Sequence, residues 1–128
     1  DYGARVQIVA ISSNSLTTHP QDGPEGLRQQ AIANGWSFPY LFDADQRVAR
    51  AFRAACTPDP FLFDASHRLV YRGQLDGSRP SNAIPCDGRD LRAALDAVLA
   101  GAAVTPVQQP SIGCNIKWEP GQEPDWAR

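Results

Sequence analysis

The apolar run at residues 5–12 (RVQIVAIS) constrains the fold more than any other feature of the sequence. It is compact, rich in Val and Ile, and too short for a helix, which is typical of a buried parallel strand. A helix is expected over 24–34, with Pro24 at its first position and Gly35 just past its end. A second short apolar run follows at 38–42. This order of strand, helix and strand indicates an α/β fold.

The predicted core side of this unit is carried by a few residues. Leu27, Ala31 and Ile32 are expected to face the core from the first helix. The strand at 38–42 contains Pro39, which cannot donate to a ladder, so we expect it at an edge of the sheet.

Three further elements are expected after residue 42. Asp43 predicts the cap of a second helix, with Gln46 completing a capping-box variant, and Val48, Ala49 and Phe52 supplying its apolar side. Two apolar runs, 60–63 and 69–72, flank a polar loop and predict an antiparallel hairpin. A last helix is expected over 87–99, capped by Asp87 and ended by Gly101.

The tail is rich in proline and is expected to be an extended arm that packs through Ile112 and Trp118. The sequence therefore predicts one partial domain over 1–101 and an arm over 102–128.

Composition excludes several classes of function. The net charge of −2 and the absence of a Lys/Arg block give no electrostatic basis for nucleic-acid binding. No apolar run reaches the roughly 18 residues of a membrane span. The three cysteines form no Cys-x-x-Cys pair, and neither histidine stands at zinc-site spacing from them, so no metal and no cofactor are expected. This cysteine usage is compatible with the cytoplasm, which is the predicted compartment.

Four segments together carry a resemblance to a known family. They are Cys56-Thr57-Pro58-Asp59, the following FLFD at 61–64, RLVYRG at 68–73, and PSIGCNIKW at 110–118. In this order they resemble the second half of a thioredoxin-like domain of the redoxin superfamily, of the alkyl hydroperoxide reductase/thiol-specific antioxidant type. The resemblance covers essentially the whole chain. Pro60 departs from it, because a strand-forming residue is expected there.

The resemblance implies a cis linkage at Thr57-Pro58, which would form a ledge where an extended substrate pairs with the backbone. It also implies an N-terminal strand and an active-site helix upstream of residue 1, with the attacking cysteine at the start of that helix. Without that strand, two half-sheets would face an empty slot. Each buried, unpaired backbone group would cost roughly 1–3 kcal/mol, so we expect the chain alone to be unstable and largely inactive.

The remaining cysteines have two interpretations each. Cys56 is either an auxiliary thiol near the redox centre or a small buried hydrophobe. Cys114 is either a resolving thiol on a movable tail or an inert anchor, and Cys86 is expected to have no role. Asp59 and Asp64 are interpreted mainly as turn or strand-end residues, with proton transfer as the alternative. Arg68, Arg72 and Arg79 are interpreted as solvated charges.

The functional hypothesis is a thiol-disulfide oxidoreductase or thiol peroxidase. Its substrate would be a thiol/disulfide protein or a peroxide, and a homo-oligomer is compatible with the sequence. The alternative is a redox-inactive thioredoxin-like module that binds a peptide or protein against the Thr57-Pro58 ledge.

Overall fold

The computed structural model describes residues 1–127 and shows a small mixed helix/strand architecture with short sheets, compatible with the α/β class. Within these residues the strands form three two-stranded sheets. The chain divides into two compact units, Asp1–Ala55 with Asn115–Arg128, and Cys56–Cys114. This division falls at residue 55, inside the predicted partial domain 1–101. The predicted boundary at residue 101, between that domain and the C-terminal arm, stays a prediction.

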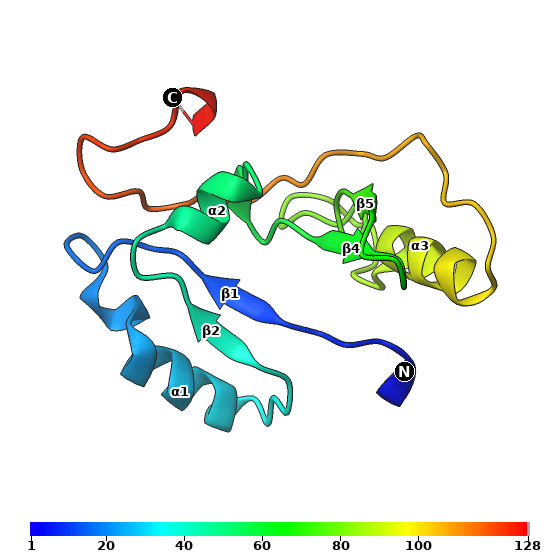
Figure 1. Ribbon diagram of the computed structural model, residues 1–128, viewed down its shortest axis with the longest axis horizontal. Helices are drawn as coiled ribbons and strands as arrows, with labels where there is room; N and C mark the ends of the chain where they lie inside the picture. The colour runs from blue at the N-terminus through cyan, green and yellow to red at the C-terminus, as the bar shows by residue number, and fades with distance from the viewer. Residues whose placement is uncertain (128) are drawn as a thin grey trace. The chain divides into compact units, whose positions relative to one another are not determined.

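The first unit contains the predicted strand-helix-strand arrangement (Figure 1). Strand β1 (Ala10–Ser12) pairs in parallel with β2 (Tyr40–Phe42), and helix α1 (Pro24–Ala33) lies beside them. Short 3-10 helices occupy Gly3–Arg5 and Pro20–Asp22. Proline begins α1 as predicted, and Gly35 follows it with φ of +63°, a conformation that glycine adopts without strain.

The two strands are shorter than predicted. The expected strand 5–12 is reduced to three residues, because its pairing partner β2 begins only after Pro39. Pro39 has no amide hydrogen, but its carbonyl accepts a hydrogen bond from the Ala10 amide at 2.9 Å. The prediction for Ile32 was also wrong, since its side chain is 66% exposed, whereas Leu27 is buried as expected.

Helix α2 (Arg47–Ala51) begins differently from the predicted capping box. Gln46 precedes it in the left-handed conformation, with φ of +58°, and makes no cap with its side chain. Instead, its buried side-chain amide donates to the backbone carbonyls of Ser13 and Lys117, at 2.6 and 2.9 Å. The Asp43 carboxylate accepts hydrogen bonds from two amides of the first turn, so Asp43 still satisfies part of the helix start.

The C-terminal residues complete the core of the first unit. Ile116 and Trp118 are buried together with Ala49 of α2, and the Arg50 guanidinium lies 5.0 Å above the centre of the Trp118 ring. The predicted packing of Trp118 is therefore confirmed. The prediction for Ile112 was wrong, because this side chain is 70% exposed.

The second unit contains the predicted hairpin. Strands β4 (Phe61–Phe63) and β5 (Leu69–Arg72) pair antiparallel, and Pro60 lies outside β4. The Asp64 carboxylate accepts the amides of Ser66 and Arg68, so its predicted turn role is confirmed.

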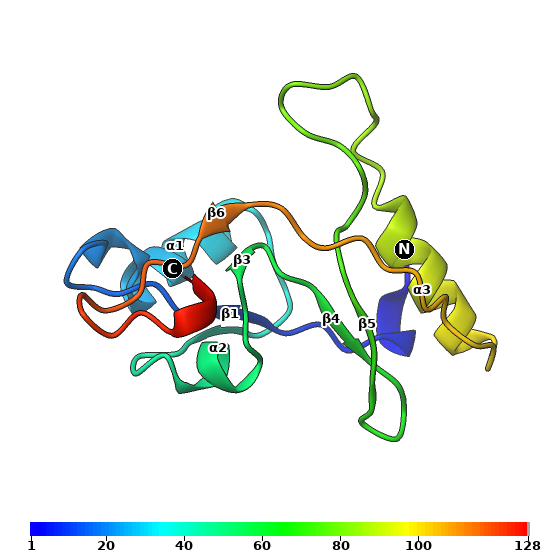
Figure 2. The ribbon, with the colours of Figure 1, turned by 90° about the horizontal axis from the view of Figure 1, so that it is seen from above.

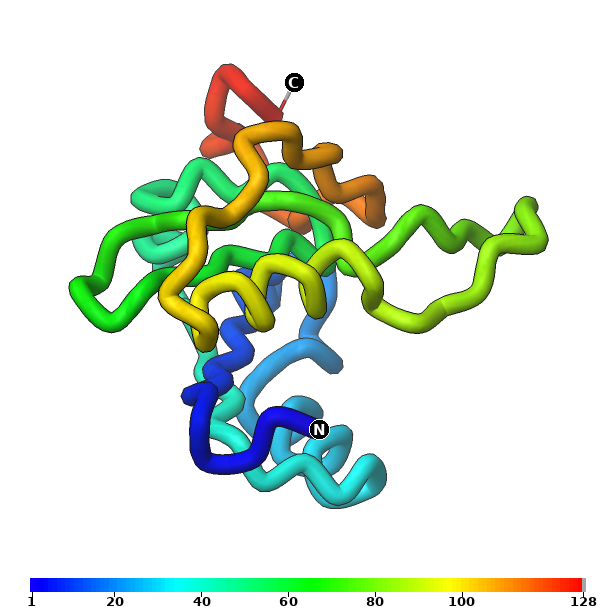
Figure 3. Tube along the Cα trace, turned by 90° about the vertical axis from the view of Figure 1, so that its right-hand side faces the viewer, coloured from blue at the N-terminus to red at the C-terminus, as the bar shows by residue number. Residues whose placement is uncertain are grey.

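Helix α3 (Arg89–Leu99) follows the hairpin and is itself followed by Gly101 at φ of +68°. Its N-cap is Gly88, one residue later than the predicted Asp87. The side chain of Asp87 instead accepts the Arg89 amide at 3.1 Å. Between β5 and α3 the chain makes a long loop, visible as the yellow-green excursion in Figure 3. No helix within residues 1–127 combines the length and the apolar character that a bilayer crossing requires.

Candidate thiol site

The predicted ledge lies on strand β3 (Cys56–Thr57) of the second unit. The Thr57-Pro58 peptide bond is cis, which confirms the sequence prediction. Cys56 is buried, at 9% exposure, and its thiol donates weakly to the Pro58 carbonyl across 3.5 Å. Thr57 and Pro58 are exposed, so the ledge lies at the surface directly after a buried thiol.

The C-terminal segment approaches this ledge closely. Strand β3 pairs with β6 (Cys114–Asn115), as Figure 2 shows. Just before β6, the Gly113 amide donates to the Cys56 sulfur. A Cβ atom built on Gly113 would lie 2.1 Å from the Thr57 carbonyl oxygen, so no larger residue fits without a backbone shift.

An ion pair lies near the same thiol. The Arg72 guanidinium on β5 is 3.0 Å from the Asp59 carboxylate, and the Asp59 side chain is only 6% exposed. The Arg72 side chain is 36% exposed and lies 4.9 Å above the centre of the Phe61 ring. The interpretation of Arg72 as a solvated charge was therefore wrong. Arg79 is likewise engaged, because it donates to Gln74 and to two backbone carbonyls.

The surroundings of Cys56 disfavour its thiolate. Burial raises the pKa of the Cys56 thiol above its ordinary value, and the Asp59 charge raises it further. Arg72 and the Gly113 amide act in the opposite direction but do not outweigh these effects. Cys56 is therefore a protonated thiol at neutral pH, and a nucleophilic attack from this site requires another group to take the proton.

The structure brings some of the predicted site residues together and leaves others apart. Cys56, Thr57 and Pro58 are contiguous, and Cys114 stands on the strand that pairs with β3. Cys86 is exposed in the long loop, and all three cysteines are free. The sequence analysis did not predict the contact of Gly113 with Cys56 or the ion pair between Asp59 and Arg72. Among residues 1–127, no three His, Cys, Asp or Glu side chains form a cluster that could hold a metal ion.

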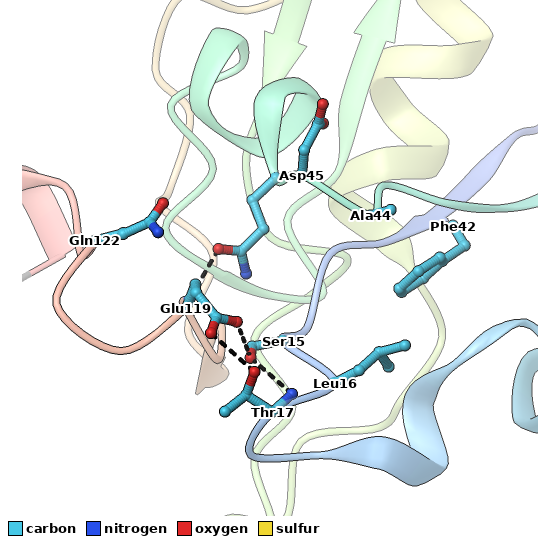
Figure 4. A pocket seen from close by; sticks show the side chains of 9 residues that line it. Ser15, Leu16, Thr17, Phe42, Ala44, Asp45, Glu119 and Gln122 are labelled. Atoms are coloured by element: carbon cyan, nitrogen blue, oxygen red, sulfur yellow. Dashed lines mark hydrogen bonds between the residues drawn. The ribbon is translucent and has the colours of Figure 1, made fainter.

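A separate pocket of about 370 Å³ lies in the first unit, between residues 15–17, the segment 42–46 and the C-terminal residues (Figure 4). Glu119 accepts hydrogen bonds there from the hydroxyls of Ser15 and Thr17, at 2.5 and 2.8 Å. The Gln46 side chain accepts the Glu119 amide at 2.9 Å. Both carboxylate oxygens of Glu119 are thus engaged in hydrogen bonds to residues 15–17. We interpret these contacts as fixing the C-terminal segment to the first unit, and not as a binding site.

Comparisons with known proteins identify two similar solved structures. One is a hypothetical protein from Sinorhizobium meliloti 1021, with 52% sequence identity and a TM-score of 0.91. The other is an uncharacterized conserved protein from Geobacillus kaustophilus, with the same identity and TM-score. Each match covers 94% of this chain but only 67% and 65%, respectively, of the other protein. No family model matches the chain, and no curated protein matches it.

Proposed function

We propose that this chain, which belongs to the same family as the Sinorhizobium meliloti protein, is part of a thiol-disulfide oxidoreductase or thiol peroxidase with a thioredoxin-like fold. The observation that carries the proposal is the position of Cys56. This buried thiol accepts a hydrogen bond from the Gly113 amide, lies near the Asp59–Arg72 ion pair, and directly precedes the exposed residues Thr57 and Pro58. A protonated thiol in this position can serve as the second thiol of a two-thiol reaction.

The attacking thiolate is expected outside the present chain. Because the pKa of Cys56 is raised, this thiol is suited to an auxiliary or resolving step rather than to the first attack. The longer relatives have room for an additional strand and helix, since the match leaves about a third of their length uncovered.

An exposed apolar face in the first unit supports this expectation. Ile11 of β1 and Leu41 of β2 are register partners on one face of the parallel pair, and they are 42% and 50% exposed. Parallel sheets are normally covered on both faces. A further segment packed on this face would remove both side chains from water.

The proposed chemistry needs two thiols and an external reductant. The attacking thiolate forms a bond to one sulfur of a disulfide substrate and expels the other sulfur as a thiolate. A second thiol, Cys56 or Cys114, then displaces the remaining half and leaves a protein disulfide. With a hydroperoxide, the O–O bond breaks, the alcohol or water leaves with a proton, and the resulting sulfenic acid condenses with the second thiol to release water. A dithiol restores both cysteines.

Two assays test the proposal on this chain and on the Sinorhizobium meliloti protein. They are hydroperoxide consumption with dithiothreitol as reductant, and reduction of insulin disulfides. We expect turnover by the longer protein and little by this chain. Cys86→Ser serves as the control. If this chain shows turnover, and Cys56→Ser reduces it no more than Cys86→Ser does, the assignment of the chemistry to Cys56 is wrong. A longer protein without thiol-dependent activity in both assays would contradict the function itself.

A redox-inactive binding module is the second candidate, and the raised pKa of Cys56 is the observation that favours it. A thiol titration separates the two candidates. A rapidly alkylated cysteine with a pKa well below about 8.5 in the longer protein supports redox work, and uniformly slow thiols support binding.

A further inference from the structure

The backbone of the ledge at Thr57-Pro58 is paired along one edge with the chain's own C-terminal segment, while both residues stay exposed to solvent. An extended peptide can bind a protein by adding a strand to a sheet edge, which requires free backbone amides and carbonyls on that edge. Strand β3 contributes only two residues, and it already pairs with β6. A second strand on the same edge would need the groups that β6 uses.

Gly113 brings the C-terminal segment unusually close to the backbone of Thr57. Its amide bonds the Cys56 sulfur, and its Cα hydrogen faces the Thr57 carbonyl where a Cβ would be 2.1 Å from the oxygen and 2.8 Å from the carbon. Since Gly113 has no left-handed φ, the reason for glycine here is space rather than backbone conformation. The segment is therefore shaped to lie against the ledge.

We propose that Gly113 and strand β6 occupy the backbone edge of the ledge, so that the site accepts compact oxidants and excludes extended polypeptides. The compact oxidants are low-molecular-weight compounds with a weak S–S or O–O bond. This inference rests on the proposed function for its substrate class. It also opposes the peptide-binding alternative, because a peptide would have to displace the chain's own strand first.

The test compares two disulfide probes that release the same leaving group. One is the small symmetric disulfide of nitrothiobenzoate, and the other is an extended peptide of about ten residues whose cysteine carries nitrothiobenzoate. In a Cys86→Ser/Cys114→Ser background, the Cys56 sulfur attacks the probe, loses its proton to the buffer, and expels coloured nitrothiobenzoate. The measurement is the ratio of the two rate constants.

We expect the small probe to react at least about tenfold faster than the peptide, and Gly113→Ala to lower this ratio by about tenfold. The control Gly77→Ala places its Cβ at an ordinary 3.5 Å from Ile84 and should leave the ratio unchanged. Equal rates for the two probes in the unaltered background would overturn the inference.

Hydrogen–deuterium exchange on the unaltered chain provides a second measurement that needs no variant. The Gly113 amide should exchange more slowly than amides of the exposed loop around Cys86, because it is bonded to the Cys56 sulfur. Exchange at the rate of an unprotected amide would refute the inference even if Gly113→Ala fails to fold. Both measurements use single chemical events rather than turnover. They can therefore succeed when the oxidoreductase assays fail, and the reverse.

Discussion

The Asp59–Arg72 pair allows a prediction with two independent readouts. The variants are Arg72→Met, Asp59→Asn and the double variant. Methionine keeps most of the apolar stem of Arg72 and removes its charge, while asparagine keeps the shape of Asp59. The ion pair spans 3.0 Å, and the two side chains are 36% and 6% exposed.

The expected loss of stability follows from this burial. Removing one partner of a fully buried pair costs about 3–5 kcal/mol. Because Arg72 is partly exposed, solvent screens the pair, and we expect about 1–2 kcal/mol from its loss. Loss of the stacking on Phe61 adds about 0.5–1 kcal/mol. Arg72→Met should therefore lower the free energy of unfolding by about 2 kcal/mol, and the double variant should lose about 1 kcal/mol less than the sum of the singles.

The second readout is the pKa of Cys56, measured from the pH dependence of its alkylation in the Cys86→Ser/Cys114→Ser background. Arg72→Met removes a charge that lowers this pKa, so the pKa should rise. Asp59→Asn removes a charge that raises it, so the pKa should fall. Urea unfolding followed by tryptophan fluorescence gives the stabilities. If both variants lowered the pKa, they would be acting by loosening the site, and the electrostatic reasoning would be refuted.

Two further predictions concern parts of the chain away from the thiol. Trp118→Ala should lower the free energy of unfolding by about 3 kcal/mol, since this ring is buried with Ala49 and Ile116, and the more exposed Trp126→Ala should cost clearly less in the same urea titration. The pKa of Asp76 is lowered to about 2, chiefly by hydrogen bonds from the neighbouring turn, so its stabilisation is present above its ordinary pKa and is lost as the pH falls toward 2. The stability difference between the wild type and Asp76→Asn should therefore shrink over this acid range, and parallel pH profiles would contradict the assignment.

Local signals in the sequence were sufficient for helix α1 and the hairpin, but not for the starts of α2 and α3. Pro24 and Gly35 frame α1, and Asp64 closes the turn of the hairpin through short-range hydrogen bonds. The lengths of the strands depend on the partner strand instead. The apolar side chains of Val6, Ile8 and Val9 could not reveal that β2 offers only three residues for pairing.

The same distinction holds for the candidate site. The cis linkage at Thr57-Pro58 was predicted from the resemblance, whereas the role of Gly113 depends on a pairing across more than fifty residues of sequence. The ion pair could have been found from the hairpin alone. A loop at 64–68 sets Phe61 opposite Arg72, which brings the guanidinium to the residues just before β4. Arginine on a short strand looks solvated when the register is not considered.

The connectivity of the first unit has a consequence for synthesis on the ribosome. Its chain leaves after Ala55 and returns only at Asn115, and two of the three buried residues in its Ala49 cluster, Ile116 and Trp118, come from this last stretch. A nascent chain therefore keeps Ala49 and its surroundings unfinished until Trp118 has been synthesised. Premature termination anywhere before Ile116 would yield an N-terminal half that lacks its hydrophobic centre and is open to degradation.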